Sequence, residues 1–450
     1  MLGKPHPSGQ RELFNVFLKD IINPQHELAL LADKIDWEYF EKELSPYFSN
    51  TGRPSHPIRL MVSMLLLKRL FNISDEQLAE QWVMNPYMQY FSGMNTFQHR
   101  FPMDPSNLVH FRKRIGKEGI EKIFAYSVKM HGKQAQEKTI IADTTVQENN
   151  ITYPTDAKLY KRGIDKLNDL FDKYNIPRRQ SYRRISKQLL RESYNPNHPR
   201  RHKKAKKAIK KLHTLLGRML REFYRNAPED ILKENNELLN IIEAVYTQTR
   251  YDKNKIYSYH KPYTACISKG KPHKKYEFGN KIGLSITAKS LIITSVRAFK
   301  GNPHDSKTIE PVLNGHIQYT GSVPEELIFD RGGRGKKQIR ETKICIPGKP
   351  LKKDNAHQRR KKRKKFRRRA AIEPVIGHLK KDFRMIINHL WDEDSPIINA
   401  MLAATGWNLK KMMEKLKKEF FVSIFFRLIM DFFYQKFFTK NNKLDLKLSF

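Results

Sequence analysis

The chain has 450 residues and a formal net charge of +40, from 86 Lys and Arg against 46 Asp and Glu. This length predicts two or three domains rather than one simple core. The charge opposes compaction, and because its cations are spread over several segments, nucleic acid is a more natural counterpart than a membrane surface. The two cysteines, Cys266 and Cys345, are too few for a disulfide framework or a zinc cluster, so a reducing compartment is expected.

The first 130 residues are expected to form a helical N-terminal domain. Residues 57–70 make a nearly continuous apolar run, Ser74 and Gln77 have the spacing of a capping box, and a further helix with interleaved basic residues follows Pro105. Short helices with basic faces fit a helix-turn-helix-like DNA reader, and they fit equally well a bundle whose cations are only solvated. The sequence leaves both interpretations open.

A catalytic domain is predicted over residues 131–415, with a helical insertion at about 157–255. Residues 139–142 predict a short apolar strand that ends at Asp143. Residues 158–225 then carry 22 Lys and Arg against five Asp and Glu, which leaves few intramolecular partners for the cations. We expect this insertion to grip phosphates, although a charge run also fits a solvated lobe. Its candidate contacts are Lys203, Lys204, Lys206 and Lys207.

The chain returns to strands after the insertion. Residues 276–286 and 291–299 predict a β-hairpin, 309–313 a short helix, 326–329 a strand that ends at Asp330, and 343–346 a last short strand. The glycine-rich turn after Asp330 contains Arg331 and Arg334, and its glycines would let the backbone approach DNA closely. The pattern predicts a mixed α/β sheet that carries a large insert.

A helix after this last strand is predicted to place Phe366, Arg369, Glu373 and Lys380 along one face. A carboxylate between two cations, next to a run of Lys and Arg, is poorly explained as a core helix. It suits a site where Glu373 holds a metal ion and the cations hold phosphate.

Three acids, Asp143, Asp330 and Glu373, could therefore converge as oxygen ligands of a hard divalent ion such as Mg²⁺. Two ions about 4 Å apart would support an in-line displacement at phosphorus. Each acid alone has an ordinary explanation, as a turn former at a strand end or as a salt-bridge partner. His304 and Asp305 could support the metal ligands or form a plain turn.

The C-terminal segment 416–450 has no assigned role. Residues 420–438 are rich in Phe, Ile and Leu, but Arg427, Asp431 and Lys436 would be costly in a bilayer. The interpretation preferred over a membrane span is an amphipathic terminal helix that packs on the body or is poorly ordered.

Several blocks of the sequence resemble the DDE transposases of bacterial insertion sequences, most closely the insertion-sequence-five family of the insertion-sequence-four-like superfamily. The catalytic blocks are ADTTVQENNITYPTD (142–156), SKGKPHKKYEFGNK (268–281), GNPHDS (301–306), FDRGGRG (329–335) and RRRAAIEPVIGHLKKDFRM (367–385). The N-terminal run FSNTGRPSHPIRLMVSMLLLKRLFNISDEQLAEQW is similar to the N-terminal domain of that family. The resemblance covers about residues 46–411, in the expected order.

The resemblance implies an RNase H-like catalytic core, with Asp143, Asp330 and Glu373 as the DDE triad, and two bound Mg²⁺ or Mn²⁺ ions. The Tyr-Arg-Glu-Lys signature of the family falls on Phe366, Arg369, Glu373 and Lys380, so Phe366 departs from it by lacking the hydroxyl group. Arg369 and Lys380 would contact DNA phosphates near the scissile bond.

The function expected from this resemblance is binding of terminal inverted repeats, followed by strand cleavage and transfer into target DNA. Bringing two DNA ends together argues for a homodimer. No membrane partner is expected, and the absence of an apolar signal core predicts a cytoplasmic, nucleoid-associated bacterial protein. The alternatives are a catalytically decayed relative that acts as a DNA-binding repressor, and a host nuclease built on the same core.

Overall fold

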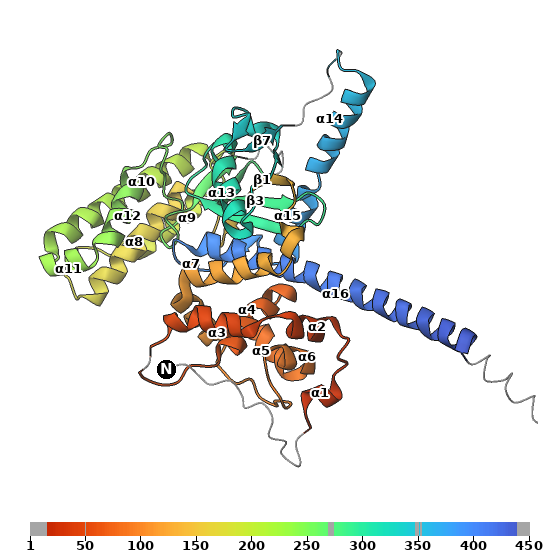
Figure 1. Ribbon diagram of the computed structural model, residues 1–450. Coiled ribbons are helices and arrows are strands. Elements are labelled where there is room, and N and C mark those ends of the chain that lie inside the picture. The colour runs from red at the N-terminus through yellow and green to blue at the C-terminus, as the bar shows by residue number, and fades with distance from the viewer. Residues whose placement is uncertain (1–15, 50, 269–273, 347–350, 352, 439–450) are drawn as a thin grey trace, which may run out of the picture.

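The computed structural model describes residues 16–49, 51–268, 274–346, 351 and 353–438 (Figure 1). Its centre is a mixed eight-stranded sheet with the order β2-β3-β1-β5-β7-β6, to which β4 adds by pairing with β3, and β8 by pairing with β1. The strands are β1 (Thr139–Asn149), β2 (Ala265–Ser268), β3 (Tyr276–Thr287), β4 (Ile293–Phe299), β5 (Glu326–Ile328), β6 (Gln338–Ile339), β7 (Thr342–Cys345) and β8 (Ile387–Asn388). The predicted mixed α/β sheet is confirmed.

The predicted β-hairpin is present as β3 and β4, which pair antiparallel. The first strand differs from the prediction, since β1 continues to Asn149 and Asp143 lies within it rather than at its end. β1 is long because β3 pairs with it antiparallel over nine successive positions, from Ile140 opposite Thr287 to Glu148 opposite Gly279. On its other edge, β1 pairs in parallel with β5 near its start and with β8 near its end.

Helices cover both faces of the sheet (Figure 1). α13 (Ile309–Thr320), which is longer than predicted, packs on one face in a core that includes Ala142, Leu313 and Phe329. The opposite face, with Ile141 and Leu284, belongs to a larger core that also contains residues of α15 (Ile372–Lys381) and α16 (Ser395–Phe438). Because side chains alternate along a strand, Asp143 shares the face of Ile141, toward α15.

The N-terminal region is helical, as predicted, and the capping box of Ser74 and Gln77 is present. Its helices are α1 (Leu18–Ile21), α2 (Glu27–Lys34), α3 (Trp37–Leu44), α4 (Ile58–Leu70), α5 (Asp75–Met84), α6 (Pro86–Phe91) and α7 (Ser106–Lys129). Their apolar residues join the core on the Ile141 face of the sheet, so the helices and the sheet share one interior.

Some Arg and Lys side chains of the N-terminal helices pair with groups inside the protein instead of facing solvent. Arg112 and Lys68 both pair with Asp75, at 3.0 and 2.8 Å. Arg69 is buried and donates to the carbonyl of Phe383 and to Oδ1 of Asn399, which joins α4 to the C-terminal segments. A buried guanidinium needs such acceptors because desolvation of an unpaired charge is costly.

The insertion folds into five helices: α8 (Asp156–Lys173), α9 (Arg183–Glu192), α10 (His202–Asn226), α11 (Glu229–Glu234) and α12 (Asn236–Thr247). They enclose a hydrophobic core of their own, with Leu167, Leu216 and Phe223 among its buried members. The polar sides carry the cations predicted from the sequence. Figure 1 shows this bundle beside the sheet, on the side away from α14.

The segment predicted as one helix around Glu373 is two helices, α14 (Ala356–Arg369) and α15. Pro374 explains the break, because its ring has no N–H to donate to the carbonyl of Ala370. The amide of Glu373 donates to that carbonyl instead, at 3.2 Å. Ala370 and Ala371 keep right-handed helical angles, so Arg369 still lies about one turn before Glu373.

Helix α16 is buried in the core up to about Met413 and then projects away from the body (Figure 1). The sequence predicted a terminal helix that packs on the body or is poorly ordered. Phe421, Val422, Phe425 and Met430 are exposed, so these described side chains do not pack on the body. Within the described residues, no helix is long and apolar enough to cross a membrane. Residues 439–450 of the predicted tail lie outside the described residues.

Candidate active site

Asp143 on β1 lies next to Asp330, which follows the end of the neighbouring strand β5 by two residues. β1 and β5 pair in parallel, with Ile141 opposite Ile328, and this register continued by two residues places Asp330 opposite Asp143. Consistently, the negative charge of Asp330 contributes to raising the pKa of Asp143. Two acids 187 positions apart in the sequence are thus brought together by the register of the sheet.

The Asp143 side chain is only 14% exposed. Burial raises its pKa to about 6, and the Asp330 charge adds to this, while the Thr144 amide and Arg369 act in the opposite direction. Removing a carboxylate from water disfavours its charged form, and a second carboxylate nearby disfavours it further. Because the charged form of Asp143 is disfavoured in this environment, the binding of a cation next to it would be favourable.

Arg369 links Asp143 to Glu373. Its Nη2 atom lies 3.5 Å from Oδ2 of Asp143 and 3.2 Å from Oε1 of Glu373. Its Nε atom is buried without a hydrogen-bond partner. The guanidinium therefore occupies the space between the first and third predicted acids, where it neutralises part of their charge.

The three predicted acids do not yet form a common set of ligands. Among the described residues, no three His, Cys, Asp or Glu side chains are grouped closely enough to hold one ion. Glu373 has a 60% exposed side chain, and among the described residues its one ion pair is with Arg369, which leaves room for a change of rotamer. The donor set itself has the oxygen chemistry that Mg²⁺ prefers, with one carboxylate on β1, one just after β5 and one on the first turn of α15.

Asp305 joins the site from the other face of the sheet. Its Oδ1 accepts from the Thr144 hydroxyl at 3.0 Å and from Nζ of Lys281 at 2.9 Å. Burial would raise the pKa of Asp305, but the hydrogen bond and charge of Lys281 outweigh it and hold the pKa below its usual value. Asp305 is therefore ionised at neutral pH, and Lys281 balances its charge.

Gly332 shows how closely the loops meet behind these acids. A Cβ atom on Gly332 would lie 2.5 Å from Oδ2 of Asp305 and 3.1 Å from Oδ1 of Asp330. The Gly332 amide donates to Asp330, at 2.9 Å. Of the pair left open by the sequence, Asp305 thus supports the acidic cluster, whereas His304 makes local turn contacts with Ser306.

Lys281 contacts the acidic cluster and was not among the residues predicted from the sequence. It is buried on β3, donates to Asp305 and to the carbonyl of Pro303, and so ties β3 to the loop after β4. A signal was present, because a lysine that directly precedes the apolar half of a predicted strand needs a partner if it is buried.

Some of the predicted DNA-binding cations lie near the acids, whereas others lie in a different part of the protein. Arg331 and Arg334 are exposed in the loop that follows Asp330, and Lys380 lies two turns after Glu373 on α15. Phe366 is 47% exposed on α14 and contributes a ring without a hydroxyl. The four lysines predicted in the insertion are exposed on the first turns of α10, away from this cluster.

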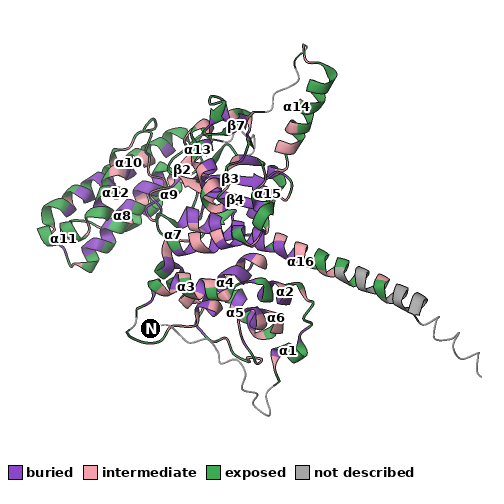
Figure 2. Ribbon diagram, in the orientation of Figure 1, coloured by how far each residue is buried: buried purple, intermediate pink, exposed green. Residues whose placement is uncertain are grey.

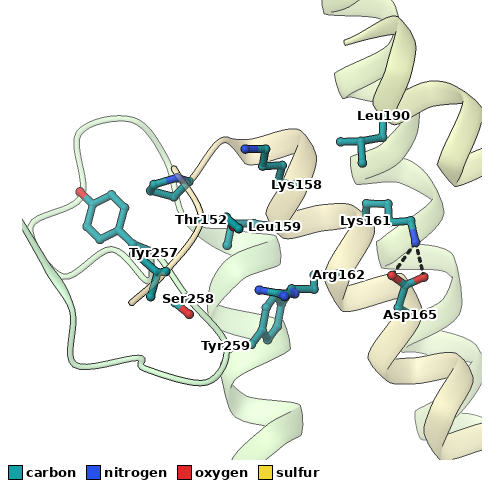
Figure 3. A pocket seen from close by; sticks show the side chains of 12 residues that line it. Thr152, Lys158, Leu159, Lys161, Arg162, Asp165, Leu190, Tyr257, Ser258 and Tyr259 are labelled. Carbon is teal, nitrogen blue, oxygen red and sulfur yellow. Dashed lines mark hydrogen bonds and ion pairs between the residues drawn. The ribbon is translucent and has the colours of Figure 1, made fainter. Parts of the chain in front are cut away.

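A cavity of about 290 Å³ lies at the root of the insertion rather than at the acids (Figure 3). Lys158 and Arg162 line it from α8, and Tyr257 and Tyr259 from the segment before β2. Lys161 pairs with Asp165 beside it, at 2.5 Å. We assign it no role in the chemistry, since the paired carboxylates lie elsewhere.

Two transposase family models match the chain. Residues 16–114 match the family described as "Transposase domain (DUF772)", and residues 245–409 match the "Transposase DDE domain". These ranges include the N-terminal helices and, except for β1, the strands and helices that carry the acids. The fold and the matched domains together define a transposase, which is an enzyme.

One curated protein is similar to part of the chain. The chain is 40% identical over 185 residues to "Uncharacterized protein ORF8 in nfe locus" of Rhizobium meliloti, an alignment that covers 40% of this chain and 89% of that protein. The chain belongs to the DDE transposase family. No solved structure matches it.

Proposed function

We propose that this transposase binds the terminal inverted repeats of a bacterial insertion sequence of the insertion-sequence-five type, and that it cleaves and transfers DNA strands at the acidic cluster. The observation that carries the proposal is the juxtaposition of Asp143 on β1 and Asp330 just after β5, with Glu373 joined to Asp143 through Arg369. The order of the strands around β1 supports an RNase H-like core.

In this proposal Asp143, Asp330 and Glu373 hold two Mg²⁺ or Mn²⁺ ions, which would supply charge stabilisation at the attacking and leaving oxygens. Asp143 and Asp330 are already adjacent, and Glu373 completes the set by rotating away from Arg369. Asp305 holds Thr144 and Lys281 in place and so fixes the part of β1 that presents Asp143.

The released guanidinium of Arg369 is then available for a DNA phosphate next to the scissile bond. Lys380, Arg331 and Arg334 extend the cationic surface around the acids and would fix the DNA backbone without reading its sequence. Two DNA ends must be held together for transfer, and we propose a homodimer in that complex. The retention of all three acids favours an active enzyme over a decayed relative that acts as a repressor.

The direct test is strand cleavage by the purified protein. With Mg²⁺ and duplex DNA that carries the inverted repeat, we expect nicking at the end of the element. Glu373→Gln keeps the size of the side chain but removes its charge, and we expect it to lower the nicking rate by about 10³-fold or more while DNA binding is retained. Arg340→Gln, an exposed change outside the acidic cluster, is the matched control.

Two results would contradict the proposal in different ways. Absence of nicking by the wild type at any salt concentration would refute cleavage, and equal nicking by Glu373→Gln would refute the site. A host nuclease on the same core would cut DNA without protecting a defined sequence. Footprinting on the inverted repeat distinguishes that alternative.

The insertion is proposed to grip DNA phosphates outside the cleavage site. Replacing Lys203, Lys204, Lys206 and Lys207 by Gln should make the dependence of log affinity on log salt shallower, by about 0.9 for each lost phosphate contact. Lys204 lies 3.6 Å from Glu192, so its contribution should be the smallest. An unchanged slope would show that this surface of α10 is only solvated.

A further inference from the structure

Helix α14 has a composition that folding does not explain. Its fourteen residues contain ten Lys and Arg and no Asp or Glu, and none of them is buried (Figure 2). A surface helix normally holds its place with an apolar stripe against the core. α14 has no such stripe, and its like charges three and four residues apart repel one another.

Two cations on one face of α14 join the helix to the sheet. Lys365 pairs with Glu326 at the start of β5, and Arg369 pairs with Asp143 and Glu373. Lys362, on the same face, pairs at 2.6 Å with Asp354, which lies just before the start of α14. These three cations follow one another at intervals of three and four residues, so they lie on one face. A capping box between Asn355 and Gln358 fixes the start of the helix.

Beyond this face, α14 carries two further rows of cations, and the second of them also lines an open cavity of about 870 Å³ between α14 and the starts of β1 and β5. At 100° per residue, the row of Arg360, Arg363 and Arg367 lies about 100° from the row of Lys361, Lys364 and Arg368. Five of these six side chains are exposed, and Arg368 is half-buried. The helix is about 20 Å long, so its ten cations follow one another every ~2 Å, close to the ~1.7 Å axial spacing of the charges on duplex DNA.

We propose that α14 lies in the major groove of the DNA duplex beside the cleavage site, with each of these two rows on the phosphates of one strand. A helix with its side chains is about 10–12 Å wide, which matches a major groove of ~12 Å. One row would be enough to follow a single backbone. Two rows flanking one helix fit a groove with phosphates on both sides.

The position of α14 sets the place of this contact on the DNA. Its last residue, Arg369, touches the acids, and Figure 1 shows the helix extending away from the body from that point. A length of about 20 Å corresponds to about six base pairs at ~3.4 Å each. The inference rests on the proposed function, since the acids define where cleavage occurs.

The test uses the full-length protein and inverted-repeat duplex with Ca²⁺ in place of Mg²⁺, so that binding is measured without cleavage. Two triple variants change the rows separately: Arg360→Gln, Arg363→Gln and Arg367→Gln in one, and Lys361→Gln, Lys364→Gln and Arg368→Gln in the other. We expect each to lower the log–log salt slope by about two to three. Lys410→Gln, Lys417→Gln and Lys418→Gln on α16 remove the same charge elsewhere and should change the slope by less than about one.

Hydroxyl-radical footprinting gives the second readout. One variant should lose protection on one strand and the other variant on the opposite strand, within about six base pairs of the scissile phosphate. A changed slope in only one variant would place α14 along a single backbone and overturn the groove arrangement. Unchanged slopes in both, with wild-type cleavage intact, would overturn this inference alone. Failure of the wild type to bind duplex DNA would overturn the proposed function with it.

Discussion

Asp143→Asn is expected to abolish DNA cleavage and, at the same time, to stabilise the metal-free protein. The loss of cleavage should be about 10³-fold or more, because an amide does not replace a carboxylate as a metal ligand. The gain in stability follows from the raised pKa of about 6, since the unfolded chain ionises this group more easily than the folded one does. At pH 8 we expect the free energy of unfolding to rise by about 1–3 kcal/mol.

The sign of this effect fixes its pH dependence. Because the folded pKa of Asp143 is raised, wild-type stability falls as pH rises from the unfolded value of 3.8 to about 6 and the penalty is constant above it. The melting temperatures of Asp143→Asn and wild type should therefore converge as pH is lowered toward 4. Binding of Mn²⁺, which needs the charged carboxylate, should weaken in the wild type as pH falls through about 6.

Asp305→Asn provides the matched control with the opposite sign. The pKa of Asp305 is held below its usual value by Lys281, so its charge stabilises the folded state above the unfolded pKa. We expect Asp305→Asn to lower the free energy of unfolding at pH 8 by about 1–2 kcal/mol, because Lys281 then keeps a buried charge without an anion. If Asp143→Asn and Asp305→Asn lowered the free energy of unfolding by similar amounts, the distinction between Asp143 as a metal ligand and Asp305 as the ion-pair partner of Lys281 would be refuted.

Arg369→Gln is expected to affect metal binding and DNA cleavage in opposite directions. The guanidinium lies between Asp143 and Glu373, so its removal should leave these carboxylates free for a cation. We expect the Mn²⁺ affinity of the DNA-free protein, followed by the metal-induced shift in melting temperature, to rise about tenfold. Cleavage should fall by about 10²-fold or more, because the phosphate loses its charge-assisted donor.

Two further variants separate local contact from general electrostatics. Arg331→Gln removes the same charge from an exposed position beside Asp330 and should change the Mn²⁺ affinity by less than about threefold. Arg369→Lys keeps the charge and should restore part of the cleavage. An unchanged Mn²⁺ affinity in Arg369→Gln would show that these carboxylates are not the cation site.

The register between β1 and β5 shows what the sequence could not give. Asp143 and Asp330 each follow a recognisable apolar run, but their pairing depends on a parallel contact that local patterns do not encode. The prediction that β1 ends at Asp143 is wrong for the same reason, because pairing with β3 extends the strand through polar residues. The unpredicted strands β6 and β8 have two residues each, which is too few to give a periodic signal.

The chemistry of the site was partly visible in the sequence. The residue types and their blocks pointed to Asp143, Asp330 and Glu373. The sequence left open whether Glu373 is a metal ligand or a salt-bridge partner of Arg369, and the structure contains that ion pair. The role of Lys281 and the insertion of Arg369 between two acids were not predicted. Both depend on side chains that meet across the sheet or between a strand and a helix, at separations in the chain of 24 and 226 residues.

By itself, the sequence determined the kind of partner through its charge, the helical character of the N-terminal region and the insertion through their periodicity, and the candidate acids through their blocks. Only the tertiary structure decided which face of β1 presents Asp143, that the N-terminal helices share a core with the sheet, and that α14 ends at the acids with two rows of cations exposed. The physical reason is that periodicity and composition act over a few residues, whereas strand register and buried charge pairing are set by contacts between distant parts of the chain.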